Sequence, residues 1–350
     1  MWEDKVRKVV PYTPGEQPRI NNLIKLNTNE NPYPPAPAVR ERLKDLKYGD
    51  LRLYPDPNCR LLVDALSGYH KVKPSQVFVG VGSDDVLSVA FLTFFNGDVP
   101  ILFPDITYSF YDVWADLYHI PYEIMPLKAD FSIDKNDYLK ENGGIVIANP
   151  NAPTGLELDV SVIEEIVSKN KDSVVIVDEA YVDFGGTTIL PLIDKYENLL
   201  VVRTFSKSRN MAGLRIGYAI GSEKLIKYMS DVKFSINSYT MNMPSLELGK
   251  LSVEDDEYFK TTCAKVIDTR ERTKKALKEL NFSFPDSRTN FIFAKYDGPV
   301  SRDDIAAELR KRNILVRCFN GERIKDYMRI SIGTDEEMRV VIEALKEVLR

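Results

Sequence analysis

The first two-thirds of the chain alternate between short apolar runs and amphipathic stretches. The apolar runs are rich in β-branched residues and are bounded by Gly, Pro, Asn or Asp, which is typical of buried strands. The predicted strands cover QVFVGVG (76–82), VPILFP (99–104), GIVIANP (144–150), SVVIVDEA (173–180), LLVVRTFS (199–206) and RIGYAIGS (215–222). The predicted helices cover CRLLVDALSGYH (59–70), DDVLSVAFLTFF (84–95) and SVIEEIVSKN (161–170).

This alternation predicts the fold class of residues 36–240. Strands that are apolar throughout are buried on both faces, and helices between them connect parallel neighbours. We therefore expect a large α/β domain with a mostly parallel central sheet covered by helices.

The two ends of the chain have a different pattern. Residues 1–35 are rich in Pro and Asn, which predicts an extended arm with turns. Residues 241–350 combine helices and strands in the manner of a smaller α+β domain. We expect the arm and residues 241–350 to pack together as a discontinuous second domain. The elements predicted there are a charged helix (255–280), the strand NFIFAKY, the helix DDIAAELRKRN, the strands ILVRCF and YMRISIG, and the helix EEMRVVIEALKEVL.

The composition excludes several classes of protein. The 350 residues are 44% hydrophobic and 28% charged, as in globular rather than disordered chains. The 47 basic and 52 acidic residues leave a net charge of −5, so the basic excess of a nucleic-acid-binding protein is missing. No apolar run approaches the roughly 18 residues of a membrane span, and the N-terminus lacks a signal-peptide pattern. We therefore expect neither a nucleic-acid partner nor a membrane.

Cysteine and histidine are scarce. Cys59, Cys263 and Cys318 are odd in number and widely spaced, which fits neither a disulfide framework nor a metal site. This pattern favours a reducing compartment, and we expect a cytoplasmic protein. His70 and His119 are the two histidines, so we expect no metal centre and assign acid–base chemistry to other residue types.

Polar residues follow several of the predicted strands at their carboxyl ends, where open α/β sheets bind ligands. Asp178 comes directly after VVIV, and Lys207 follows LLVV closely. Taken alone, Lys207 fits a surface lysine and Asp178 fits a helix cap. Together, they match a pyridoxal phosphate site, because the lysine can carry the aldehyde and the carboxylate keeps the pyridinium protonated. Tyr181 is placed to offer a phenol to the same ligand.

A phosphate site is expected at the start of the helix that follows VFVGVG. Free N–H groups at a helix N-terminus bind anions, and Ser83 lies there. Asp84 and Asp85 fit the helix dipole as caps, but their charges repel phosphate, so the backbone and Ser83 are the expected contacts. Arg215 is the expected charge partner. A dinucleotide-binding loop is the competing interpretation, but GVGSDD lacks its third glycine.

These motifs together resemble the histidinol-phosphate aminotransferases, a branch of the fold-type I aminotransferases that depend on pyridoxal 5'-phosphate. The resemblance covers essentially the whole chain. It implies an aspartate-aminotransferase-like fold with a large cofactor-binding domain and a smaller domain. The motifs are LNTNENPYPP, LYPDP, GVGSDD, TYSFY, NPNAPTG, VDEAYVDF, RTFSKSRNMAGLRIGY and MRISIGT.

The resemblance implies a role for each candidate residue. Lys207 would hold the cofactor as an internal aldimine, Asp178 would pair with the ring nitrogen, and Tyr181 would bind the ring hydroxyl. The other implied cofactor contacts are Ser83, the backbone of Asp84, Tyr108 stacked on the ring, Asn151, Thr204, Ser206 and Arg215. The implied substrate contacts are Tyr12, Asn29, Arg317 and Arg329. Tyr54 would reach the phosphate held by the partner subunit, which implies a homodimer with shared active sites.

One position departs from the family pattern. Many relatives have two asparagines before PTG, and the one next to the proline donates an amide to the ring hydroxyl. Here Ala152 occupies that position, which leaves Asn151 as the candidate for the contact. Tyr108 also has an alternative interpretation as an ordinary core residue.

The resemblance also implies a reaction, a ping-pong transamination between an amino donor and a keto acid. The implied pair is L-histidinol phosphate and 2-oxoglutarate, giving imidazole acetol phosphate and L-glutamate, in histidine biosynthesis. An aromatic-amino-acid aminotransferase and a threonine-phosphate decarboxylase are alternatives with the same cofactor. A non-catalytic binding module that keeps the fold is an alternative from another class.

Overall fold

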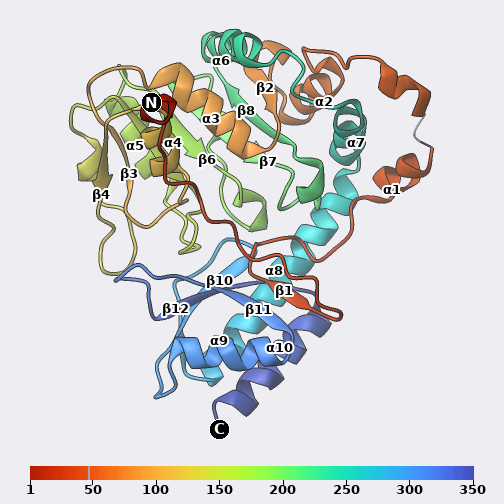
Figure 1. The fold of residues 1–350 in the computed structure, drawn as a ribbon, viewed down its shortest axis with the longest axis vertical. Helices are drawn as coiled ribbons and strands as arrows, with labels where there is room; N and C mark the ends of the chain where they lie inside the picture. The colour runs from red at the N-terminus through yellow and green to blue at the C-terminus, as the bar shows by residue number, and fades with distance from the viewer. Residues whose placement is uncertain (46–47) are drawn as a thin grey trace.

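A computed structural model of the protein describes residues 1–45 and 48–350, which build two β-sheets (Figure 1). The larger sheet has seven strands in the order β2-β8-β7-β6-β5-β3-β4. Its neighbouring strands are parallel, except that β8 runs antiparallel to β2 and β7. The strands are β2 (Val77–Gly80), β3 (Ile101–Pro104), β4 (Tyr122–Met125), β5 (Gly144–Ala148), β6 (Val175–Asp178), β7 (Leu199–Thr204) and β8 (Gly217–Gly221).

Helices cover both faces of the larger sheet. Successive side chains of a strand point to opposite faces, so Val175 and Val177 join one core while Ile176 joins the other. The first face packs against α2 (Arg60–His70), α5 (Val160–Lys169) and α7 (Met243–Glu254). The second packs against α3 (Ser83–Phe94), α4 (Tyr111–Tyr118) and α6 (Glu223–Ile236). The predicted mostly parallel sheet with two covered faces is confirmed.

The smaller sheet has five strands in the order β1-β11-β12-β10-β9. β1 pairs in parallel with β11, and the other pairs are antiparallel. Its core lies against three helices at the lower end of the molecule (Figure 1). The elements are β1 (Ile24–Leu26), α8 (Asp256–Glu279), β9 (Phe282–Ser283), β10 (Phe291–Tyr296), α9 (Arg302–Lys311), β11 (Ile314–Cys318), β12 (Tyr327–Ser331) and α10 (Asp335–Val348).

Some elements lie outside the pattern predicted from the sequence. The N-terminal arm contains β1, whereas only extended chain and turns were expected there. β4 is an edge strand with two exposed residues, Glu123 and Ile124, so it lacks the continuous apolar run of its neighbours. Helix α1 (Pro37–Lys44) packs through Val39 against the core on the first face of the larger sheet. The domain boundary at residue 240 stays a prediction. Within residues 1–45 and 48–350, no helix is long and apolar enough to cross a membrane.

Candidate active site

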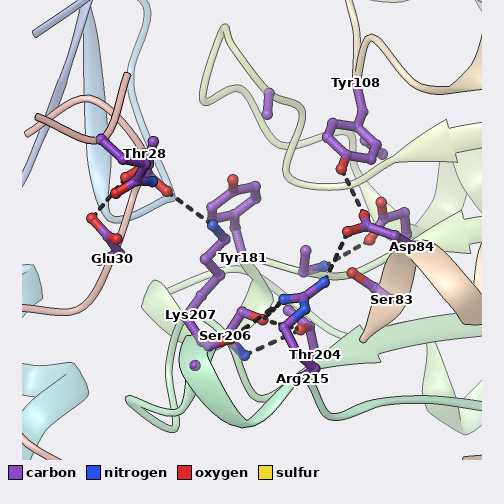
Figure 2. Close-up of a pocket in the computed structure, with 17 residues that line it drawn as sticks. Thr28, Glu30, Ser83, Asp84, Tyr108, Tyr181, Thr204, Ser206, Lys207 and Arg215 are labelled. Carbon is purple, nitrogen blue, oxygen red and sulfur yellow. Dashed lines mark hydrogen bonds and ion pairs between the residues drawn. The ribbon is translucent and has the colours of Figure 1, made fainter. Parts of the chain in front are cut away.

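Three neighbouring parallel strands end at the same edge of the larger sheet. In the register of the sheet, Ala148 of β5 lies opposite Asp178 of β6, which lies opposite Val202 of β7. The residues that follow these strands therefore converge on one cavity of about 360 Å³ (Figure 2). It is lined by the predicted residues Ser83, Asp84, Tyr108, Asp178, Tyr181, Thr204, Ser206, Lys207 and Arg215.

Asp178 is a buried acid at the base of this cavity. Its Oδ2 accepts a hydrogen bond of 3.1 Å from the Tyr111 hydroxyl, and its Oδ1 accepts one of 3.1 Å from the Ala180 N–H. Burial raises the pKa of Asp178 to about 6, although these two hydrogen bonds lower it; the carboxylates of Asp84 and Glu179 raise it further. Such an acid is stabilised by a ligand that brings a positive charge.

Lys207 projects into the cavity from the loop after β7 (Figure 2). Its Nζ donates to the Thr28 carbonyl at 3.2 Å and lies 5.8 Å from the centre of the Tyr181 ring. The side-chain amide of Asn31 donates to the Lys207 carbonyl at 3.0 Å. The segment after β1 therefore holds the lysine at both its amine and its backbone.

The part of the first cavity around Ser83, Ser206 and Arg215 has the features of an anion site. Ser83 begins helix α3, after Gly82 with a φ of 84°. A Cβ at Gly217 would lie 2.3 Å from the Ser83 nitrogen, so the close approach of β8 to this turn requires glycine. Arg215 lies beside Ser206, with Nη1 and Oγ 3.4 Å apart.

The side chain of Asp84 also lies in this cavity, where only its backbone was expected. Its Oδ2 forms an ion pair of 3.0 Å with Arg215, and its Oδ1 accepts from the Tyr108 hydroxyl at 2.7 Å. The carboxylate thus orients both side chains. The ion pair also partly neutralises the charge of Arg215. A phosphate bound here would therefore share the guanidinium with Asp84.

A second cavity of about 160 Å³ adjoins the first. The two share Thr28, Tyr108, Ala152, Tyr181 and Lys207. The second is also lined by the four residues predicted to bind substrate, Tyr12, Asn29, Arg317 and Arg329.

Arg329 is the main charge in the second cavity. Its guanidinium lies over the rings of Phe291 and Phe319, at 5.3 and 5.8 Å, and its Nη2 donates to the Asn27 carbonyl at 3.1 Å. Its Nε is buried and has no hydrogen-bond partner among the residues that the structure describes. Burial lowers the pKa of Arg329. A half-buried guanidinium whose buried Nε–H is unpaired among the described residues fits an anionic ligand.

Two predicted residues do not line either cavity. Asn151 donates to the Ile106 carbonyl and to Thr154 Oγ1, both at 2.9 Å, and accepts from Thr107 Oγ1 at 2.9 Å. Its polar atoms are therefore paired with Thr154 of its own loop and with the segment that follows β3, and its position does not support a cofactor contact. Tyr54 is 81% exposed and packs against Tyr239, with ring centres 4.6 Å apart.

The structure adds residues that the sequence analysis did not single out. Thr28, Glu30 and Gln17 from the N-terminal arm line the first cavity. The Thr28 hydroxyl donates to Glu30 at 2.7 Å. The motif LNTNENPYPP contains both Thr28 and Glu30, but the family resemblance implies a role for Asn29 alone. Nothing in the sequence pattern distinguishes Tyr111 from a core residue, because a buried tyrosine in an apolar helix usually serves packing alone.

Comparisons with known proteins agree with this geometry. Residues 21–345 match the family described as aminotransferase class I and II. A histidinol-phosphate aminotransferase of Lactococcus lactis subsp. cremoris is 50% identical over 349 residues, covering 100% of this chain and 98% of the relative. A crystal structure of a putative histidinol-phosphate aminotransferase from Erwinia carotovora has a TM-score of 0.86 at 25% identity, covering 93% of this chain and 96% of the other. A Sinorhizobium meliloti histidinol-phosphate aminotransferase in complex with pyridoxal-5'-phosphate has a TM-score of 0.85 at 23% identity, covering 94% and 91%.

Proposed function

Since this chain belongs to the class I and II aminotransferases, we propose that it is a histidinol-phosphate aminotransferase that uses pyridoxal 5'-phosphate. The proposed reaction converts L-histidinol phosphate and 2-oxoglutarate into imidazole acetol phosphate and L-glutamate. The observation that carries it is the placement of Lys207 and buried Asp178 in one cavity that continues to Arg329.

The residues of the first cavity fit this cofactor. When bound, pyridoxal phosphate supplies an aldehyde for amino groups and a ring that accepts electrons. Lys207 Nζ is the amine that would hold the aldehyde, and Asp178 is the buried acid that would face the ring nitrogen. Tyr181 would bind the ring hydroxyl and Tyr108 would cover the ring. The phosphate would be held by the start of α3 with Ser83, and by Thr204, Ser206 and Arg215.

The chain's own groups then carry the proton transfer. Lys207 Nζ would be the base that removes the proton from the donor's α-carbon. The Thr28 carbonyl lies 3.2 Å from this nitrogen, and both residues line the two cavities. Buried Asp178 would stabilise positive charge on the ring nitrogen beside it.

The second cavity would bind the remainder of the substrate. Arg329, with its free buried donor, and Arg317 supply positive charge for a phosphate or a carboxylate. Tyr12 and Asn29 reach this cavity from the N-terminal arm. Tyr12 stacks on Phe110 with ring centres 4.2 Å apart, which closes the arm over the site.

A comparison of substrates tests the proposal. With 2-oxoglutarate as acceptor, we expect kcat/KM for L-histidinol phosphate to exceed that for phenylalanine by roughly 100-fold, because arginines placed for a phosphate, with its three oxygens and larger negative charge, bind the smaller, singly charged carboxylate of phenylalanine less well. A preference for phenylalanine would indicate the aromatic enzyme. Release of CO₂ from threonine phosphate would indicate the decarboxylase. A protein that binds no cofactor and turns over none of the three would be a binding module.

The raised pKa of Asp178 predicts a pH dependence of cofactor binding. The carboxyl is neutral below a pH of about 6 and ionised above it, and only the ionised form can hold a positively charged ring nitrogen. We expect the affinity of the cofactor-free protein for pyridoxal phosphate to fall by up to about tenfold per pH unit below this midpoint. Equilibrium titrations from about pH 5 to about pH 8 measure it.

The Asp178→Asn variant is the control for this dependence. It keeps the shape of the side chain but cannot ionise, so only the titration of the cofactor's own phosphate should remain. If the variant and the unaltered protein show the same pH dependence, Asp178 does not face the ring nitrogen.

We also propose that the protein is a homodimer in which Tyr54 reaches the partner's phosphate site. Tyr54 lies outside both cavities of its own chain. It packs against exposed Tyr239, and further exposed apolar residues lie close to these two in the sequence, namely Leu51, Leu53 and Ile236. Such a concentration of exposed apolar residues is typical of an interface. Sedimentation equilibrium measures the state of association, and a monomer at working concentration would contradict the proposal.

A further inference from the structure

Tyr111 connects helix α4 to the acid at the base of the first cavity. It is the first residue of α4 and is fully buried. Its hydroxyl donates to Asp178 Oδ2 at 3.1 Å. Because Asp178 ends strand β6, this hydrogen bond joins an element that covers the sheet to the strand end that carries the acid.

The hydrogen bond supplies half of the fixed contacts of the carboxylate. The Ala180 N–H donates to Oδ1, and the Tyr111 hydroxyl donates to Oδ2. With one donor on each oxygen, the plane of the carboxylate is fixed. A hydrogen bond to an ionised acceptor also favours the ionised form over the neutral one.

We propose that Tyr111 is a positioning residue for Asp178: its hydroxyl orients the carboxylate and keeps it ionised, so that it can hold the protonated ring nitrogen of pyridoxal phosphate. The inference rests on the cofactor in the proposed function. It concerns a residue that does not line either cavity and acts only through Asp178.

The negative charges around Asp178 make the hydrogen bond from the Tyr111 hydroxyl important. Asp84 of α3 and Glu179 beside Asp178 are both carboxylates, and they disfavour its ionised form. The neighbouring phenols are Tyr108 and Tyr111, while Lys207 and Tyr181 line the same cavity. Burial raises the pKa of Asp178 to about 6, and the hydrogen bonds from Ala180 and Tyr111 lower it. The loss of one donor therefore moves the acid further towards its neutral form.

The aromatic surroundings of Tyr111 allow a conservative test. Its ring packs against Phe91, Phe103, Tyr108 and Trp114, with ring centres 6.2, 6.0, 5.7 and 6.4 Å away. The variant Tyr111→Phe keeps this packing and removes only the hydroxyl. Tyr138→Phe is a matched control. Tyr138 is also buried in the larger domain, but its hydroxyl has no partner in the described part of the chain.

The experiment titrates cofactor-free, full-length protein with pyridoxal phosphate at several pH values. For Tyr111→Phe we expect an affinity about twofold weaker near neutral pH and about tenfold weaker near pH 5, because losing a hydrogen bond to the carboxylate leaves a smaller fraction of Asp178 ionised. We expect the midpoint of the pH dependence to rise by about one unit. The pH dependence of the absorption band of the bound cofactor should show the same rise in its midpoint. Tyr138→Phe should behave like the unaltered protein.

A double-mutant cycle separates positioning from a structural role. In an Asp178→Asn background, Tyr111→Phe should have no further effect on cofactor affinity, because the ionised acid is already gone. An equal loss in both backgrounds, or an unchanged midpoint in Tyr111→Phe, would overturn the inference. Failure of the proposed function would give a different result, namely that the unaltered protein binds no cofactor or does not transaminate.

Discussion

Replacing Lys207 with alanine is expected to lower the rate of transamination by about 10⁴-fold, the upper range for loss of a positioned acid–base group. The reason is that Lys207 Nζ is the amine that both cavities share. Without it, the cofactor aldehyde has no covalent attachment to the chain, and the donor's α-carbon has no base. The measurements are single-turnover kinetics and the mass of the borohydride-reduced protein, which should lack the added cofactor.

The variant should remain folded, because Lys207 makes a single side-chain hydrogen bond within the described chain, to Thr28. Lys227→Ala is a suitable control, since Lys227 is an exposed lysine of α6 paired with Asp231. It should leave turnover unchanged. A Lys207→Ala protein that keeps both its turnover and the visible absorption band of bound cofactor would disprove the assignment of the lysine.

Replacing Arg329 with alanine is expected to reduce kcat/KM for histidinol phosphate by roughly 100-fold or more, as for one side of a desolvated charge pair. The affinity for pyridoxal phosphate should change little, because Arg329 lines the second cavity and not the first. Steady-state kinetics and a separate cofactor titration measure the two effects. Arg329→Lys should recover only part of the loss, because lysine lacks the paired donors of a guanidinium.

The control for this prediction is Arg339→Ala. Arg339 lies on α10 and is 74% exposed, with Glu336 as its ion-pair partner. The substitution should leave kcat/KM unaltered. Equal losses of substrate and cofactor affinity in Arg329→Ala would mean that the arginine serves the first cavity, contrary to the proposal.

The larger sheet and the base of the site are predictable from sequence for a physical reason. Strands β5, β6 and β7 are buried on both faces, so their sequences are continuous apolar runs with clear ends. A polar residue directly after such a run lies at the carboxyl edge of the sheet. This predicts the edge at which Asp178 and Lys207 lie, where both line the first cavity, without any knowledge of how the chain packs.

Contacts between distant segments could not be predicted in this way. The hydrogen bonds of Thr28 and Asn31 to Lys207 join residues far apart in the sequence. The pairing of Asp84 with Arg215 depends on the register of β8 against β2. Asn151 is a further case, because its place in the motif suggests a ligand contact, whereas its amide donates to Ile106 after β3 and to Thr154 in its own loop.

The pairing of β1 with β11 has a consequence for how the site is assembled. β1 is synthesised well before its neighbour β11, because every strand of the larger sheet lies between them in the sequence. Contacts between such distant segments form late, because closing a long loop is entropically costly. The segment that holds Lys207 follows β1 directly, so β1 cannot anchor it in the smaller sheet until β11 has left the ribosome. Lys207 thus acquires its complete surroundings only after the larger sheet has been translated.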